Sequence, residues 1–144
     1  MAAPEAYAQA VSDVARKVGA RVLIPVLEDN ITLAEHESLL PSHLAFAWPP
    51  ADTLRLAHDT WEATKLCARL NVPGAASFVP GSFDELHRRA GEYGFPVVIK
   101  TRLGNAAKGV AIATSETDLI RTYREIIARF SIPERRWPMV QEYL

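Results

Sequence analysis

The sequence contains one cysteine, Cys67, and this scarcity excludes two kinds of site at once. A single thiol cannot form a disulfide within the chain, and it cannot provide the paired cysteines of a structural zinc site. Because Cys67 lies in a predicted helix between Leu66 and Ala68, we expect a buried side chain rather than a nucleophile. The histidines are dispersed, and none has a partner at the spacing of metal ligands.

Net charge and long apolar runs are also lacking. The 144 residues carry a formal net charge of −1 and no basic run, so the composition indicates no nucleic-acid partner. No apolar stretch is long enough to span a membrane, and the opening segment MAAPEAYAQA has neither the basic start nor the apolar core of a signal peptide. With 49% hydrophobic and 23% charged residues, the sequence predicts a globular, cytoplasmic protein without a membrane partner.

What the sequence does contain is two segments of different pattern, separated between Pro49 and Asp59. The first alternates helices with short apolar strands, which is the order of an α/β domain. We expect helices at 4–18, 32–40 and 51–58, and strands at 22–27 and 43–48. Thr32 and Glu35 have capping-box spacing at the start of the second helix. Because this order starts on a helix and offers only two strands, we expect it to continue a larger domain.

Polar residues follow the first predicted strand, at Glu28, Asp29 and Asn30. The carboxyl end of a strand in an open α/β sheet is a common place for a ligand. The same residue types also suit a turn that begins the next helix. The sequence leaves both interpretations open.

The second segment, residues 59–144, contains three predicted helices, each preceded by a capping residue with an acidic side chain three positions later. The capping residues are Asp59, Ser82 and Ser115. The first of these helices is expected to bury Trp61, Leu66 and Leu70 and to end at Asn71. Strands are expected at 76–79, 96–101, 110–114 and 138–143.

The stretch FPVVIKTRLGNAAKGVAIAT, residues 95–114, predicts two strands joined by a loop of small and polar residues. Lys100 ends the first strand, and Lys108 with Gly109 precedes the second. Backbone N–H groups of such a loop, next to ammonium groups, suit the oxygens of a polyphosphate. The same pattern also fits an ordinary antiparallel hairpin whose Lys100 extends from the strand end into solvent.

Three motifs of this segment, in this order, resemble the A subdomain of the ATP-grasp superfamily. DTWEATKLCARLNVPGAAS, residues 59–77, is similar to the family's Asp-Lys helix and the Gly-Val/Ile-Pro turn that ends it. Residues 95–119 resemble the strand, phosphate-binding lysine, glycine-rich hairpin and following helix. MVQEYL, residues 139–144, resembles the strand that leads into the adenine-contacting hinge.

The resemblance implies an α/β fold with two parts. Residues 1–58 would be the C-terminal part of a preATP-grasp-like, Rossmann-like domain, and residues 59–144 would be the α+β ATP-grasp A subdomain with its antiparallel hairpin. Within the second part, Val98 would form an apolar wall for adenine, and Lys100 would contact the nucleotide phosphates. The loop would close over the phosphates through backbone N–H groups. Its residues are Gly104, Asn105, Ala106 and Ala107, with Lys108 and Gly109 at the far side.

The last strand would supply the remaining contacts to the nucleotide. Gln141 and Glu142 would offer backbone carbonyls to the adenine amino group, and the backbone N–H of Leu144 would reach a ring nitrogen. The resemblance also implies Mg²⁺, with the metal ligands and catalytic residues expected beyond Leu144 rather than within the chain.

The implied function is the ATP-binding portion of a ligase, as in carbamoyl-phosphate-synthase-like and biotin-carboxylase-like members. Such an enzyme uses ATP to activate a small carboxylate as an acyl phosphate, which an amine or similar nucleophile attacks; a homodimer is compatible with this class. The sequence departs from the family pattern at three places: Thr60 replaces a lysine, Thr101 replaces a proline, and the loop has one glycine with two alanines. Thr60 and the glycine-poor loop favour an alternative, a non-catalytic nucleotide-binding or degenerate grasp module. A third alternative is an α/β fragment without a ligand.

Overall fold

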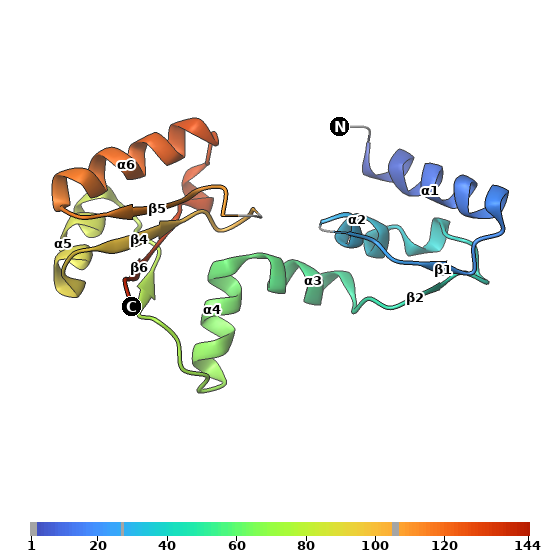
Figure 1. Ribbon diagram of the computed structural model, residues 1–144, viewed down its shortest axis with the longest axis horizontal. Helices are drawn as coiled ribbons and strands as arrows, with labels where there is room; N and C mark the ends of the chain where they lie inside the picture. The colour runs from blue at the N-terminus through green and yellow to red at the C-terminus, as the bar shows by residue number, and fades with distance from the viewer. Residues whose placement is uncertain (1–2, 27, 105–106) are drawn as a thin grey trace. The chain divides into compact units, whose positions relative to one another are not determined.

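The computed structural model describes residues 3–26, 28–104 and 107–144, so that Leu27, Asn105 and Ala106 of the expected elements lie outside the described residues. The chain forms two compact units, Met1–His58 and Asp59–Leu144 (Figure 1). Each unit has its own buried apolar cluster.

The first unit contains a two-stranded parallel sheet, in which Val22 pairs with Ala45 and Leu23 with Phe46. Its core is small: Ala8, Leu33 and Leu40 are the buried members, and Ser12 donates a hydrogen bond of 2.7 Å to the Leu39 carbonyl. The elements are α1 (Pro4–Val18), β1 (Val22–Leu23), α2 (Asp29–Glu35), the 3₁₀ helix η1 (Glu37–Leu39), β2 (Ala45–Phe46) and α3 (Ala51–His58).

The start of α2 settles one open question and corrects one prediction. Glu28 occupies the N-cap position and α2 begins at Asp29, so the polar residues after the first strand begin a helix. The predicted capping box of Thr32 and Glu35 is wrong, because both residues lie inside this helix. The Thr32 carbonyl instead lies 3.0 Å from Nδ1 of His36, close to the C-terminal end of α2.

The second unit is a four-stranded antiparallel sheet with the strand order β3-β6-β4-β5. The predicted hairpin is confirmed, since β4 and β5 pair antiparallel from Val97 with Ala113 to Lys100 with Val110. The elements are α4 (Thr60–Arg69), β3 (Ser77–Phe78), α5 (Phe83–Tyr93), β4 (Val97–Lys100), β5 (Val110–Ala113), α6 (Glu116–Arg129), the 3₁₀ helix η2 (Glu134–Arg136) and β6 (Met139–Glu142).

Helices α5 and α6 cover one face of this sheet (Figure 1). Their buried side chains pack on the inward residues of the strands, and the Tyr123 hydroxyl donates a hydrogen bond of 2.7 Å to the Pro138 carbonyl. The fully buried residues of this cluster are Phe78, Leu86, Ala90, Val97, Ile99, Ala113, Leu119, Tyr123 and Val140. The opposite face of the sheet carries the polar side chains described below.

The three predicted caps form, and they fix where each helix begins. Ser82 accepts a hydrogen bond from the Glu85 N–H, and Ser115 accepts one from the Asp118 N–H. The side chain of Asp59 accepts from two backbone N–H groups at the start of α4. These bonds satisfy donors that have no partner within the helix.

Helix α4 corrects two burial predictions. None of its side chains is fully buried, Leu70 is 64% exposed, and Cys67 is exposed rather than buried. The reason lies in the sheet, because α5 and α6 already fill its inward face and leave α4 outside that core.

Candidate functional site

The side chains of strand β4 point alternately to two chemically different faces of the sheet. Val97 and Ile99 are fully buried against the helices, whereas Val98 and Lys100 are half-buried on the other face. This alternation follows from the two-residue period of a strand. Ile112 and Val110 of β5 lie opposite Val98 and Lys100 and are about half exposed, so this face offers apolar surface beside the lysine.

Lys100 is held by a neutral partner. Its Nζ donates a hydrogen bond to Oε1 of Gln141 on β6, and Nε2 of Gln141 donates in turn to the Ser77 hydroxyl, at 3.0 Å. The Ser77 hydroxyl donates to the Ala75 carbonyl, at 2.8 Å. Because the amide nitrogen of Gln141 donates to Ser77, the amide oxygen is the end of the side chain that faces Lys100.

No carboxylate among the described residues forms an ion pair with Lys100. An ammonium group has three donors, and Gln141 takes only one of them. Lys100 is therefore fixed in position on the sheet while its positive charge remains available to an anion. The sequence suggested only a backbone role for Gln141; the side-chain role depends on the pairing of β3, β6 and β4.

The loop between β4 and β5 depends on glycine at its closing end. The Thr101 N–H donates to the Gly109 carbonyl at 3.0 Å, which continues the hairpin beyond Lys100. Gly109 has a φ of +81°, and a Cβ there would lie 2.5 Å from Cγ2 of Thr101. Gly104 also has a positive φ, of +140°, and so does Ala107, at +60°. Only glycine fits at position 109, where both the backbone and the space are restricted.

The beginning of the same loop is anchored to α4 by Arg102. Its guanidinium forms three hydrogen bonds of 2.5–3.1 Å with the Asp59 carboxylate, and it lies 3.4 Å from Oε1 of Glu62. Nη1 of Arg102 donates to the Arg135 carbonyl, and the Arg102 carbonyl accepts from the Thr60 N–H at 2.9 Å. The side chains of Arg102 and Asp59 are only 14% and 15% exposed.

Burial of Asp59 by itself would raise the pKa of its carboxyl group. The hydrogen bonds and charge of Arg102, together with the two N–H groups of α4, outweigh burial and hold the pKa of Asp59 below its usual range. Asp59 thus stays ionised and cancels the charge of Arg102. Arg102 is an anchor for the loop rather than a free cation, which the sequence did not reveal because its partner lies 43 residues away.

The remaining predicted residues lie along the ends of the strands. The Oε1 atom of Glu142 accepts a hydrogen bond from the Ala76 N–H at 2.7 Å, and the Glu142 N–H donates to the Ala76 carbonyl. Gln141 pairs with Val98 on one side and Ser77 on the other, which brings it to the same face as Lys100. Leu144 follows β6 and is 90% exposed.

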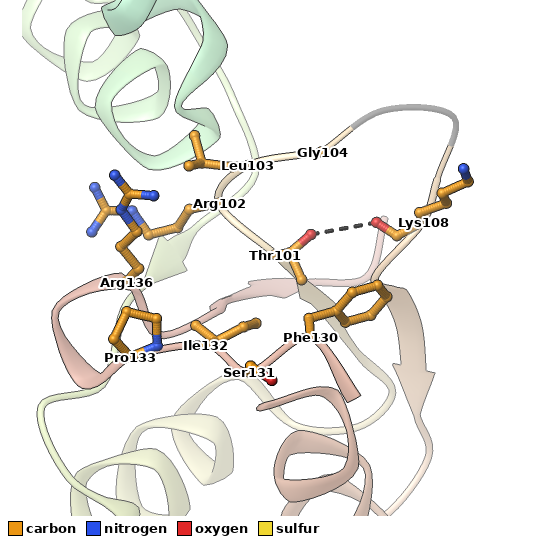
Figure 2. A pocket seen from close by; sticks show the side chains of 10 residues that line it. All are labelled: Thr101, Arg102, Leu103, Gly104, Lys108, Phe130, Ser131, Ile132, Pro133 and Arg136. Atoms are coloured by element: carbon orange, nitrogen blue, oxygen red, sulfur yellow. Dashed lines mark hydrogen bonds between the residues drawn. The ribbon is translucent and has the colours of Figure 1, made fainter. Parts of the chain in front are cut away.

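A pocket of about 490 Å³ lies between the loop and the segment that links α6 to β6 (Figure 2). Of the predicted site residues it includes Gly104 and Lys108 but not Val98, Lys100 or Gln141. The structure therefore distributes the predicted residues over two places, the Lys100 face of the sheet and this pocket.

Two further findings concern the part of the chain that the structure describes. Within it, no group of three or more histidine, cysteine, aspartate or glutamate side chains is placed to hold a metal ion. None of the helices described is long and apolar enough to cross a membrane.

A lysine on the open face of an antiparallel sheet, beside a hairpin loop of small residues, is the arrangement of the ATP-grasp class. Residues 59–132 match the family described as carbamoyl-phosphate synthase L chain, ATP binding domain. The chain belongs to this family, and with it to the ATP-grasp superfamily.

Known relatives agree with this assignment. The chain is 30% identical over 127 residues to the 2-oxoglutarate carboxylase small subunit of Hydrogenobacter thermophilus, covering 81% of this chain and 25% of the relative. It is 29% identical over 128 residues to biotin carboxylase of Pseudomonas aeruginosa, covering 83% of this chain and 28% of that enzyme. The chain thus spans about a quarter of the length of these relatives.

Solved structures show the same fold. The biotin carboxylase domain of the Hydrogenobacter thermophilus enzyme, solved as a dimer with MgADP, ADP and bicarbonate, has a TM-score of 0.72 and 25% identity over 96% of this chain and 31% of that one. Biotin carboxylase from Campylobacter jejuni, solved as a β,γ-ATP complex, has a TM-score of 0.76 and 20% identity over 95% of this chain and 31% of that one.

Proposed function

We propose that this chain supplies the ATP-binding portion of a ligase that activates a small carboxylate. The observation that carries the proposal is Lys100, a cation fixed by a neutral glutamine on the open face of the sheet. A polyphosphate needs such an uncancelled charge, because a lysine already paired with a carboxylate would have to release its partner first. Val98 lies two residues before Lys100 on the same face and offers apolar surface to the adenine.

The hairpin loop would contribute backbone N–H groups to the phosphates. Gly104, Ala107, Lys108 and Gly109 are the described residues proposed for this role, and Arg102 holds the start of the loop on α4. On β6 and beyond it, the backbone of Gln141, Glu142 and Leu144 is proposed for the adenine. In such a site the protein acts mainly by positioning the nucleotide and stabilising negative charge.

The proposed reaction transfers the γ-phosphoryl group of ATP to a carboxylate oxygen and releases ADP. The resulting acyl phosphate is then attacked by an amine or similar nucleophile, and inorganic phosphate leaves. Bound Mg²⁺ would neutralise phosphate charge, and its ligands are proposed to come from outside this chain. Residues 1–58 are proposed to be part of the preATP-grasp domain. A homodimer is also proposed, supported by the dimer of the Hydrogenobacter thermophilus domain.

A second candidate function is a nucleotide-binding module without turnover. It is favoured by the glycine-poor loop, in which Ala107 adopts a positive φ that glycine would tolerate more easily. Both candidates require nucleotide binding at Lys100, so the first experiment is the same for both.

That experiment is a calorimetric titration of the full chain with MgATP. Because the residues proposed for the nucleotide all lie in the one unit Asp59–Leu144, we expect a dissociation constant of roughly 0.1 mM or weaker. Lys100→Ala should abolish measurable binding, because it removes the charge directed at the phosphates. Lys17→Ala is the matched control, since Lys17 is an exposed lysine on α1 of the other unit. Equal loss in both variants would show general charge attraction and refute the site.

A further inference from the structure

The pocket beside the hairpin loop differs from the Lys100 face in its chemistry (Figure 2). Of the ten described residues that line it, three are cationic and none is acidic; the cations are Arg102, Lys108 and Arg136. Because the whole chain has a net charge of −1, this excess of positive charge is a local property of the pocket.

Two of these three cations remain available to a ligand. Arg102 is neutralised by Asp59 and Glu62, and its Nη1 donates a hydrogen bond to the Arg135 carbonyl. Arg136 and Lys108 form no ion pair with any side chain in the described ranges, and both are exposed. In Figure 2 Arg136 lies next to Arg102 at one end of the pocket and Lys108 lies at the other.

The floor of the pocket is apolar and is built on a fixed helix end. Phe130, Ile132 and Pro133 follow α6, and Leu103 of the loop also lines the pocket. The Ile132 N–H donates to the Ile127 carbonyl at 3.0 Å, across a left-handed Ser131 with a φ of 50°. This is the bonding of a helix C-terminus closed by a left-handed residue, so the floor is positioned by the helix itself.

The pocket and the proposed nucleotide site lie on opposite sides of the hairpin. Thr101 lines the pocket, whereas its neighbour Lys100 is directed to Gln141 on the open face. Phe130 is the C-cap residue of α6, which covers the other face of the sheet, and Ile132 packs against the core on that face. A ligand in this pocket would therefore be distinct from a nucleotide at Lys100.

We propose that this pocket binds a small amphipathic anion, namely a carboxylate that carries an apolar group of ring size. The planar guanidinium of Arg136 matches a carboxylate in geometry, and Lys108, at the other end of the pocket, adds to the positive potential without contacting the same carboxylate. The apolar group packs on Phe130 and Ile132, and no acidic lining residue repels the carboxylate. A volume of about 490 Å³ is within the range of small-molecule pockets.

The test uses 4-phenylbutyrate as the probe, titrated into the full chain and followed by calorimetry and by the Nε–H signals of the arginines in NMR spectra. We expect saturable binding, with a shift of the Arg136 signal. Arg136→Ala should weaken binding about tenfold, the size of one lost charge-assisted contact. The control is Arg135→Ala, because Arg135 is the neighbouring exposed arginine and does not line the pocket; it should change the affinity less than about twofold.

Two further measurements separate the alternatives. The uncharged amide of the same probe should bind about tenfold more weakly, and equal binding of acid and amide would overturn the anion site. Saturating MgATP should leave the probe bound, and displacement by ATP would overturn the claim of a separate site. Absence of binding, or equal losses for Arg135→Ala and Arg136→Ala, would also overturn the proposal.

Discussion

The two units of this chain differ in how completely they bury their own apolar surface. In the described part of the second unit, α5 and α6 cover a four-stranded sheet, and one cluster contains nine fully buried residues. The described part of the first unit has two strands of two residues each and a cluster of three buried residues. Large apolar side chains there stay on the surface: Val14, Val18, Val22, Ile24 and Val26 are all more than half exposed.

The comparison indicates which part of the chain can hold a precise site. A side chain is positioned accurately when the strand beneath it is paired on both sides and packed from behind. Lys100 has this support, because β4 lies between β6 and β5 and Ile99 is buried behind it. Among the described residues of the first unit, no strand has comparable support, since β1 and β2 pair only with each other there.

The largest loss of stability is expected from a cavity in the core of the second unit. Phe78→Ala should destabilise that unit by about 3–5 kcal/mol, because Phe78 is fully buried and contacts Tyr93 edge-on. The matched control is Val18→Ala in the first unit, where the side chain is 68% exposed and the loss should be below about 0.5 kcal/mol. Urea unfolding followed by NMR signals of each unit would measure both. Equal losses would contradict the difference between the two cores.

The next effect concerns the ion pair that anchors the loop. Asp59→Ala should destabilise the second unit by about 2 kcal/mol, since it removes the α4 cap and leaves the largely buried Arg102 with Glu62, at 3.4 Å, in place of its closer Asp59 partner. Ser115→Ala is the control, because it removes a helix cap without any ion pair and should cost about 1 kcal/mol. Denaturant unfolding compares the two. If the variants were equally stable, the Asp59–Arg102 pair would contribute nothing beyond a cap.

The same pair predicts a pH dependence. The pKa of Asp59 is lowered in the folded chain, so its stabilisation is fully present above its unfolded value of about 4 and is lost as pH falls through the folded pKa. Unfolding midpoints measured between about pH 6 and pH 2 should therefore fall less steeply for Asp59→Asn than for the unchanged chain. Identical slopes would show that Asp59 has an ordinary pKa.

A smaller pair of changes, of opposite sign, tests the loop geometry. Gly109→Ala should destabilise by about 1–2 kcal/mol, because its Cβ would meet Thr101 and its φ is positive. Gly91 lies within α5, and no atom lies within 4 Å of the position that a methyl group would take. Gly91→Ala should therefore stabilise the second unit by about 0.5–1 kcal/mol. Thermal unfolding of both variants gives the signs. A neutral Gly109→Ala would mean that the loop closes differently.

Much of this architecture follows from local chemistry in the sequence. Asp59, Ser82 and Ser115 were recognisable as caps, and Gly109 after Lys108 marked the end of the hairpin loop, because these features depend only on near neighbours. Burial of Leu70 and Cys67 was predicted wrongly, since helical spacing alone does not tell which helix the sheet covers.

The functional details that sequence reasoning missed are contacts over long distances along the chain. The Arg102–Asp59 pair spans 43 residues, and the bond from Lys100 to Gln141 spans 41. From the sequence alone, Asp59 had a role as a helix cap, and Gln141 had a role through its backbone carbonyl. Only the pairing of the strands brings these side chains together.

The most direct test of the central claim asks on which face of the sheet the nucleotide lies. Nuclear Overhauser effects would be measured between the adenine protons of MgATP and the side chains of the full chain. We predict contacts to the methyl groups of Val98, next to Lys100 on the open face, and none to the ring of Phe130 in the pocket. Contacts to Phe130 without contacts to Val98 would contradict the account.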